Sequence, residues 1–140
     1  MQHAILIVCF LCLMAAAQPA AAKGKVKAGF LGAETYAMKD GGCEKLKKIT
    51  EGGPKNVSTT PETLTADGFS SWETGCSFTS VKEIVKGKKW KAKMACNDEA
   101  GEINPETDIF EKQPDGSFKV TTEGKTTHFV RCEAGKGKSK

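Results

Sequence analysis

Two cysteines that enclose a pair of strand-like runs constrain the fold of this chain more than any other feature. Between Trp72 and Cys96, residues 81–85 are rich in β-formers and residues 90–96 alternate between apolar and polar side chains. Alternation with a period of two is typical of a half-buried strand. Gly87, which lies between the runs, suits a tight turn because glycine adopts positive φ readily. The stretch therefore predicts a β-hairpin.

The register of this hairpin depends on its turn. A three-residue loop over residues 85–87 pairs Ile84 with Lys88, and the same register places Cys76 directly opposite Cys96. Directly opposed residues of an antiparallel pair lie close to the range that a disulfide bridges. A shorter loop would break this match, so only the cysteines select the register. The inner face then carries Trp90, Ala92, Met94 and Cys96.

The cysteine pattern predicts two disulfides. Beyond the apolar N-terminus the chain has four cysteines, namely Cys43, Cys76, Cys96 and Cys132. The hairpin favours the Cys76–Cys96 bridge, which leaves Cys43–Cys132 as the second. Zinc is disfavoured because no two of these cysteines have the close spacing that zinc sites use. We expect no metal and no cofactor.

The N-terminus has the layout of a secretory signal peptide. Residues 4–17 are continuously apolar, and Ala20–Ala22 offers small residues before Lys23. We expect a signal peptide over residues 1–22, with cleavage after Ala22 or after Ala17. The apolar run is too short to span a membrane comfortably. The mature chain is therefore predicted to be periplasmic or secreted, without a transmembrane segment.

The rest of the chain suits one domain. The net charge of +4 resides mostly in lysines at the two ends. We expect a basic flexible segment over residues 23–32, a single β domain over residues 33–133 and a basic tail over residues 134–140. Glycine-rich turns separate many short runs, which favours an all-β fold. One short helix is predicted over residues 43–49, with Asp40 as its cap.

The C-terminal half predicts an antiparallel meander. Two-residue turns at Asp115–Gly116 and Glu123–Gly124 have favourable hairpin chemistry. These turns oppose Ile109 to Thr122 and Phe118 to Phe129. The predicted inner face carries Ile109, Phe118, Val120 and Phe129. Val130 and Cys132 are out of phase with that face, which predicts either a bulge or a sheet buried on both faces. The expected architecture is a small barrel or a sandwich.

No residue set predicts catalysis. His128 is the only histidine after the signal segment, and we interpret it as an exposed strand residue. An acidic stretch lacks the ligand order of a calcium loop and is interpreted as a solvated turn; its members are Asp98, Glu99, Glu102, Glu106 and Asp108. A small cell-envelope hydrolase that uses these carboxylates is the alternative, and carboxylates converging in a concave pocket would favour it.

Lysines form the candidate binding patch. The lysine patch consists of Lys86, Lys89, Lys91 and Lys93. It predicts binding to an acidic protein or an anionic envelope polymer. The alternative is a solvated outer face that protects a strand edge. Nucleic acid is not expected as a partner, because no aromatic residues interleave with these lysines on their face. Trp72 and Trp90 are both predicted to be packing residues.

Several short motifs resemble a group of small exported four-cysteine proteins of alphaproteobacteria that lack a characterised function. The resemblance rests on residues 68–73, Cys76–Phe78, Trp90 before Cys96, Asp115–Gly116 and Arg131–Cys132. It implies a periplasmic all-β domain. A fold-level analogy links the chain to periplasmic lysozyme inhibitors. A non-catalytic binding domain is the leading functional hypothesis, and a lysozyme-inhibitor-like protein is a further alternative.

Overall fold

A computed structural model describes residues 24–56 and 58–133 of the chain. The predicted signal peptide and the basic tail lie outside the described residues. The elements, in chain order, are the 3₁₀ turn η1 (Gly29–Leu31), β1 (Tyr36–Met38), α1 (Gly42–Thr50), β2 (Thr63–Thr65), β3 (Gly68–Ser70), β4 (Gly75–Val85), β5 (Lys89–Asn97), β6 (Ile103–Lys112), β7 (Phe118–Thr122) and β8 (Lys125–Arg131).

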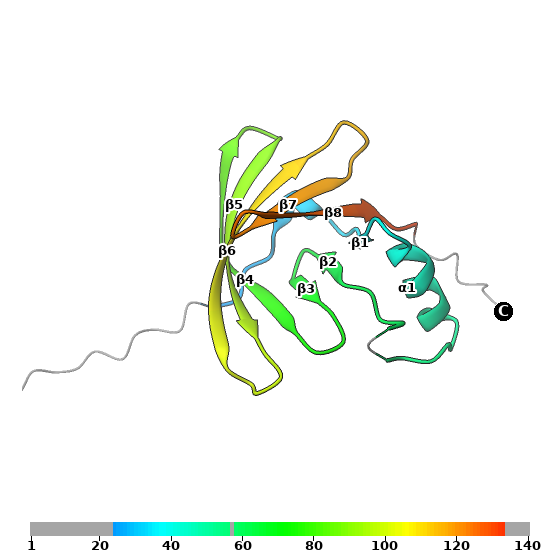
Figure 1. Ribbon diagram of the computed structural model, residues 1–140. Helices are drawn as coiled ribbons and strands as arrows, with labels where there is room; N and C mark the ends of the chain where they lie inside the picture. Colours follow the sequence, from blue (N-terminus) through cyan, green and yellow to red (C-terminus); the bar gives the residue numbers. More distant parts are fainter. Residues whose placement is uncertain (1–23, 57, 134–140) are drawn as a thin grey trace, which may run out of the picture.

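The eight strands form a closed antiparallel barrel in which each strand pairs with the next along the chain (Figure 1). Closure occurs where β1 pairs with β8, through Tyr36 opposite Arg131 and Met38 opposite Phe129. The prediction of an all-β meander with one helix is confirmed, and the barrel is the observed form. No helix in the described part of the chain has the length and apolarity needed to cross a membrane.

The β4–β5 hairpin has the predicted disulfide but not a uniform register. Cys76 lies opposite Cys96 and is bonded to it. The prediction fails toward the turn, where Val85 pairs with Lys89 instead of Ile84 with Lys88. The register shifts twice along β4, and such bulges bend a strand and increase its twist. A strand of this length in a small barrel needs that curvature.

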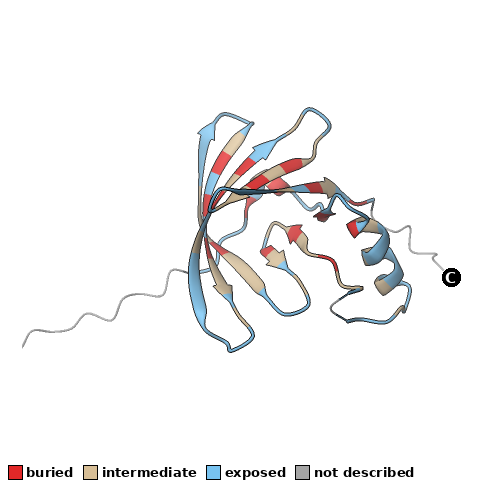
Figure 2. Ribbon diagram, viewed as in Figure 1, coloured by how far each residue is buried: buried red, intermediate tan, exposed pale blue. Residues whose placement is uncertain are grey.

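Aromatic rings make up much of the barrel interior. Figure 2 shows the buried positions in red along the barrel strands. The largest fully buried side chains include Phe78, Phe110, Phe118 and Phe129. Trp90 is buried, as predicted. Trp72 is 48% exposed and does not belong to the core, so its prediction as a packing residue is wrong. It lies in the β3–β4 turn, outside the ladder that directs side chains inward.

The segment before β1 closes one end of the barrel. Phe30 stacks on Trp90 with ring centroids 4.5 Å apart and also contacts Phe110 and Phe118 edge-on. Ala28 and Leu31 are fully buried beside it. Ala28, Phe30 and Leu31, which fall within the segment predicted to be basic and flexible, thus pack against the core. Their apolar side chains pack between the ends of the long strands. The lysines that precede them in the sequence made the segment look like a solvated end.

The β6–β7 connection is longer than predicted, and this changes the inner face. Lys112 pairs with Phe118, so five residues separate the strands rather than the two of the Asp115–Gly116 turn. Pro114 has no N–H to donate, so it cannot form the hydrogen-bonded pair that flanks a two-residue turn. The last bond across the turn is donated by the Gln113 N–H to the Ser117 carbonyl oxygen. As a result Phe110 opposes Val120 inside the barrel, and Ile109 faces outward. The Glu123–Gly124 turn and the pairing of Phe118 with Phe129 are confirmed.

Helix α1 packs outside the barrel, next to β1 and the end of β8 (Figure 1). Its N-cap is Gly41 with φ of 77°, and no side chain caps it, so the predicted Asp40 cap is wrong. Cys43 is bonded to Cys132 as predicted. The helix lies over the outer face of β8 at Val130. Val130 therefore has apolar neighbours although it faces outward, and β8 pairs with β1 without a bulge.

At Gly68 the neighbouring strand β4 leaves no room for a side chain. Its φ is 144°, and a Cβ at this position would lie 1.7 Å from the carbonyl oxygen of Cys76. We expect Gly68→Ala to lower the free energy of unfolding by about 2–3 kcal/mol, because β3 must move away from β4. Gly29→Ala is the control, since its Cβ meets nothing within 4 Å. Urea unfolding compares the two variants, and equal midpoints would contradict the prediction.

Candidate functional site

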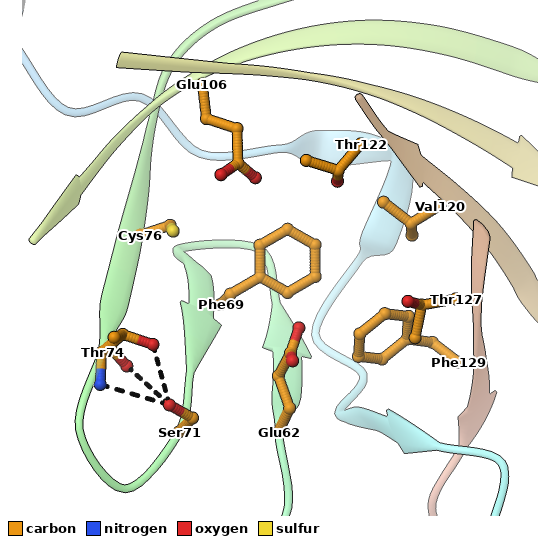
Figure 3. A pocket seen from close by; sticks show the side chains of 10 residues that line it. All are labelled: Glu62, Phe69, Ser71, Thr74, Cys76, Glu106, Val120, Thr122, Thr127 and Phe129. Atoms are coloured by element: carbon orange, nitrogen blue, oxygen red, sulfur yellow. Dashed lines mark hydrogen bonds between the residues drawn. The ribbon is translucent and has the colours of Figure 1, made fainter. Parts of the chain in front are cut away.

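Phe30 closes one end of the barrel, and we call the opposite end the barrel mouth. The mouth holds a cavity of about 210 Å³. Phe69 and Phe129 form its apolar floor, with ring centroids 5.4 Å apart. Hydroxyl groups and two carboxylates line the wall (Figure 3). The polar lining residues are Glu62, Ser71, Thr74, Glu106, Thr122 and Thr127. The mouth therefore combines an aromatic floor with an acidic wall.

The alternation of β6 places two acids inside the barrel. Phe110 faces the core, so Asp108 and Glu106, two and four residues earlier, face the same side. Glu62 arrives from the segment directly before β2. Figure 3 shows the carboxylates of Glu62 and Glu106 pointing toward the ring of Phe69 from opposite sides. Burial, and then the charge of Glu106, raise the pKa of Glu62.

Asp108 is the one buried charged residue in the described part of the chain, and its exposed fraction is 0%. Its Oδ1 accepts a 2.6 Å hydrogen bond from Thr122, which faces it from β7. Its Oδ2 is buried without a partner; a proton on Asp108 would allow a hydrogen bond with Glu106. Burial above all, with Glu106 and Glu62 nearby, raises the pKa of Asp108 to about 7, although the Thr122 hydrogen bond opposes this shift.

The rim of the mouth adds further acids. Glu73 in the β3–β4 turn lies beside Glu99 in the β5–β6 turn, and a hydrogen bond with Glu99 raises the pKa of Glu73. The predicted acidic stretch is thus divided. Glu106 and Asp108 enter the barrel. Asp98 instead stabilises its own turn, by accepting hydrogen bonds from the N–H groups of Ala100 and Glu102.

A sulfur-containing cluster adjoins the cavity. Within residues 24–56 and 58–133, the trio whose potential metal-ligand atoms lie within 4.8 Å of one another consists of Cys76, Cys96 and Glu106. The two sulfurs are joined in the disulfide, so they offer no thiolate. This arrangement makes the disulfide part of the cavity wall.

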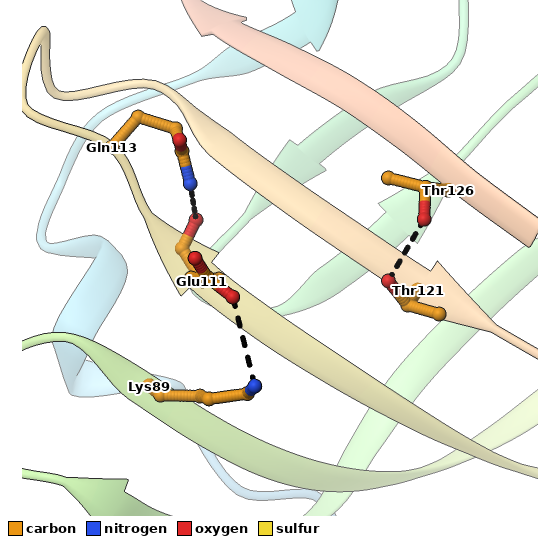
Figure 4. Close-up of polar contacts among 5 residues, drawn as sticks. All are labelled: Lys89, Glu111, Gln113, Thr121 and Thr126. Atoms are coloured by element: carbon orange, nitrogen blue, oxygen red, sulfur yellow. Dashed lines mark hydrogen bonds and ion pairs between the residues drawn. The ribbon is translucent and has the colours of Figure 1, made fainter. Parts of the chain in front are cut away.

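The lysine patch lies on the other side of the barrel wall. Lys91 and Lys93 point outward from β5, and Lys82 of β4 lies directly opposite Lys91. Lys89 forms a 3.6 Å ion pair with Glu111 (Figure 4). The hairpin acid Glu83 accepts a hydrogen bond from the Gly87 N–H.

Lys86 lies in the turn that joins β4 to β5. None of Lys82, Lys86, Lys91 and Lys93 takes part in an ion pair among the described residues. From here on, the lysine patch includes Lys82 as well. The positive charge of Lys89 is partly offset by its ion pair with Glu111.

His128 is exposed on the outer face of β8 opposite Lys119, as predicted, and it lies outside the mouth. The sequence does not predict that Glu62 belongs to the site or that Asp108 is buried. The signal for Asp108 is its position two residues before Phe110: if Phe110 faces the core, strand alternation places Asp108 on the same inner face.

Together the elements define a disulfide-bridged eight-stranded antiparallel barrel with an acidic mouth. Comparison of the chain with protein-family models, curated proteins and solved structures finds no match. The resemblance to small exported four-cysteine proteins therefore stays a prediction.

Proposed function

We propose that this protein is an exported, non-catalytic binding domain whose lysine patch holds an acidic protein or an anionic envelope polymer. The observation that carries the proposal is the direct opposition of Lys82 and Lys91 on the outer face. Like charges directly opposed across strands destabilise a sheet. An anionic partner offsets that cost, and steers its own association with the patch.

Protection of a strand edge does not account for Lys91 and Lys93. β5 is paired with β4 on one side and with β6 on the other, so it has no free edge to protect. Lys82 differs, because β3 pairs only with residues 75–77 of β4, and edge protection therefore competes as an explanation for that lysine. Solvation of the outer face remains a competing explanation. Two disulfides in a chain of this size suit an oxidising compartment, which is the support for a periplasmic or secreted location.

Charge reversal tests the patch. We expect Lys82, Lys91 and Lys93→Glu to weaken binding to poly-L-glutamate and to lipopolysaccharide at least tenfold at low salt, because three attractions become repulsions. The two probes stand for the acidic protein and the envelope polymer. Biolayer interferometry measures both affinities.

The matched control reverses three exposed lysines elsewhere, Lys45, Lys48 and Lys125→Glu, with the same change in net charge. Equal binding by the two triple variants would show that only net charge matters and would remove the patch from the proposal.

A second candidate is the small envelope hydrolase, which the convergence of Glu62, Glu106 and Asp108 favours. Paired carboxylates of differing environment are what glycoside hydrolysis requires. Against it, the carboxyl with the strongly raised pKa belongs to Asp108, which is fully buried and out of reach of a substrate. Release of reducing sugar from peptidoglycan that is lost in Glu106→Gln would favour the enzyme. The lysozyme-inhibitor alternative rests on fold analogy alone, and a lysozyme turbidity assay tests it.

A further inference from the structure

The barrel mouth has properties that binding at the lysine patch does not use. Glu62 and Glu106 extend into the cavity from opposite sides (Figure 3). Asp108 lies two residues after Glu106 and faces the same side of β6. None of the lining residues, which all belong to the described part of the chain, is lysine, arginine or histidine. Negative charge therefore gathers in a concave site without a compensating cation from the chain.

A second, independent observation comes from the buried carboxyl group of Asp108. It is fully buried, and its Oδ2 has no hydrogen-bond partner. A buried carboxylate with an unpaired oxygen is costly unless a proton or a positive charge satisfies it. Its other oxygen accepts a hydrogen bond from Thr122, a residue of the cavity wall, so the carboxyl group lies directly behind that wall.

We propose that the barrel mouth binds a small organic cation, an ammonium or guanidinium group on a short carbon chain, between Glu62 and Glu106. The charged end forms ion pairs with both carboxylates. The negative charge of an ionised Asp108 behind them attracts the cation further. The carbon chain rests on Phe69 and Phe129, whose ring faces also attract cations.

The spacing of the acids favours an organic cation over a bare metal ion. A calcium ion needs oxygen ligands about 2.3–2.6 Å from its centre, and hence close to one another. Among the described residues, no three carboxylates bring oxygens within 4.8 Å of one another. An ammonium group with three donors, or the wider fork of a guanidinium, reaches oxygens that are further apart.

Binding of the cation is coupled to a proton. The groups that face Asp108 are Glu106 on its own strand, Glu62 across the cavity and the Thr122 hydroxyl on β7, while its neighbour on β5 is Ala92. Without a bound cation, burial and the two glutamates favour the protonated form of Asp108. A cation reverses this preference, so affinity should rise as pH increases from 6 to 8.

Isothermal titration with n-butylammonium and n-butylguanidinium tests the proposal, with n-butanol as the neutral analogue and CaCl₂ as the metal. At pH 8 we expect at least one cation to bind, and Glu106→Gln to weaken it at least tenfold. The matched control, Glu102→Gln, changes an exposed acid of the β5–β6 turn and should leave the affinity within twofold. Glu62→Gln gives the same test if Glu106→Gln does not fold.

Three results would each overturn the proposal. The first is equal binding of n-butanol, which would make the mouth a merely apolar site. The second is binding of Ca²⁺ in place of both organic cations. The third is loss of cation binding in Glu102→Gln to the same extent as in Glu106→Gln. Charge reversal of the lysine patch should leave the cation affinity unchanged, so the two sites fail or succeed independently.

Discussion

Removing the Cys43–Cys132 bridge should lower the free energy of unfolding by about 4–5 kcal/mol, against about 3 kcal/mol for the Cys76–Cys96 bridge. The first bridge spans 89 residues and the second 20. A cross-link that closes a longer loop removes more freedom from the unfolded chain. The longer bridge also joins α1 to the end of β8, the strand that closes the barrel on β1.

The measurement is urea unfolding of two double variants, Cys43→Ala with Cys132→Ala and Cys76→Ala with Cys96→Ala. Each serves as the control for the other, because both replace two half-buried or buried cysteines with the same residue. A larger loss in the Cys76 and Cys96 variant would contradict the prediction. It would mean that packing of the bridge inside the mouth outweighs the entropy of the loop.

The sequence predicts most of the fold where local pattern and covalent chemistry agree. Strict alternation from Trp90 to Cys96 indicates the inner face of β5, and the cysteines select the right partner for it. Opposed cysteines do not reveal the two bulges that shift the ladder further along β4. Bulges provide the bend that a strand needs in a closed barrel. That bend depends on the whole fold, so the sequence of one hairpin does not predict it.

The candidate site is harder to predict because it depends on one residue of register. A two-residue turn at Asp115–Gly116 would turn Ile109 inward and Asp108 outward. Pro114 lengthens the connection, and the same strand then carries Asp108 and Glu106 inside the barrel. The lysine patch is different, since its outward direction follows from the phase of Trp90 alone. What the sequence does not show is that β5 has neighbours on both sides.

The N-terminal plug illustrates a second kind of limit. Phe30 and Leu31 follow a lysine-rich segment, and composition therefore favours a flexible end. The barrel needs an apolar group at its end, and Phe30 supplies a ring that stacks on Trp90. Such a contact joins residues that are far apart in sequence, so no local pattern predicts it.

The stability of the protein should fall as pH rises from about 4 to about 7, and Asp108→Asn should remove most of this decrease. The pKa of Asp108 is about 7 in the folded chain, above the ordinary value of 3.8. In that pH range the folded state keeps a proton that the unfolded state has released. Stability linked to this group is therefore fully present below the unfolded pKa and is lost as pH rises through the folded pKa.

The magnitude follows from the difference between the two pKa values, which corresponds to at most a few kcal/mol. We expect Asp108→Asn to be more stable than the wild type by about 1–3 kcal/mol at pH 8 and of similar stability at pH 4. The asparagine oxygen keeps the hydrogen bond from Thr122, and its amide group can donate to Glu106. Urea unfolding at pH 4, 6 and 8 measures the effect.

Glu102→Gln is the control for this prediction, because it removes an exposed carboxylate from the turn before β6 and should leave the pH dependence of the wild type unchanged. A wild type that gains stability between pH 5 and pH 8 would contradict the prediction. So would an Asp108→Asn variant that is no more stable than the wild type at pH 8. Addition of n-butylammonium should restore part of the stability of the wild type at pH 8, because a cation in the mouth stabilises the carboxylate that only the folded state buries.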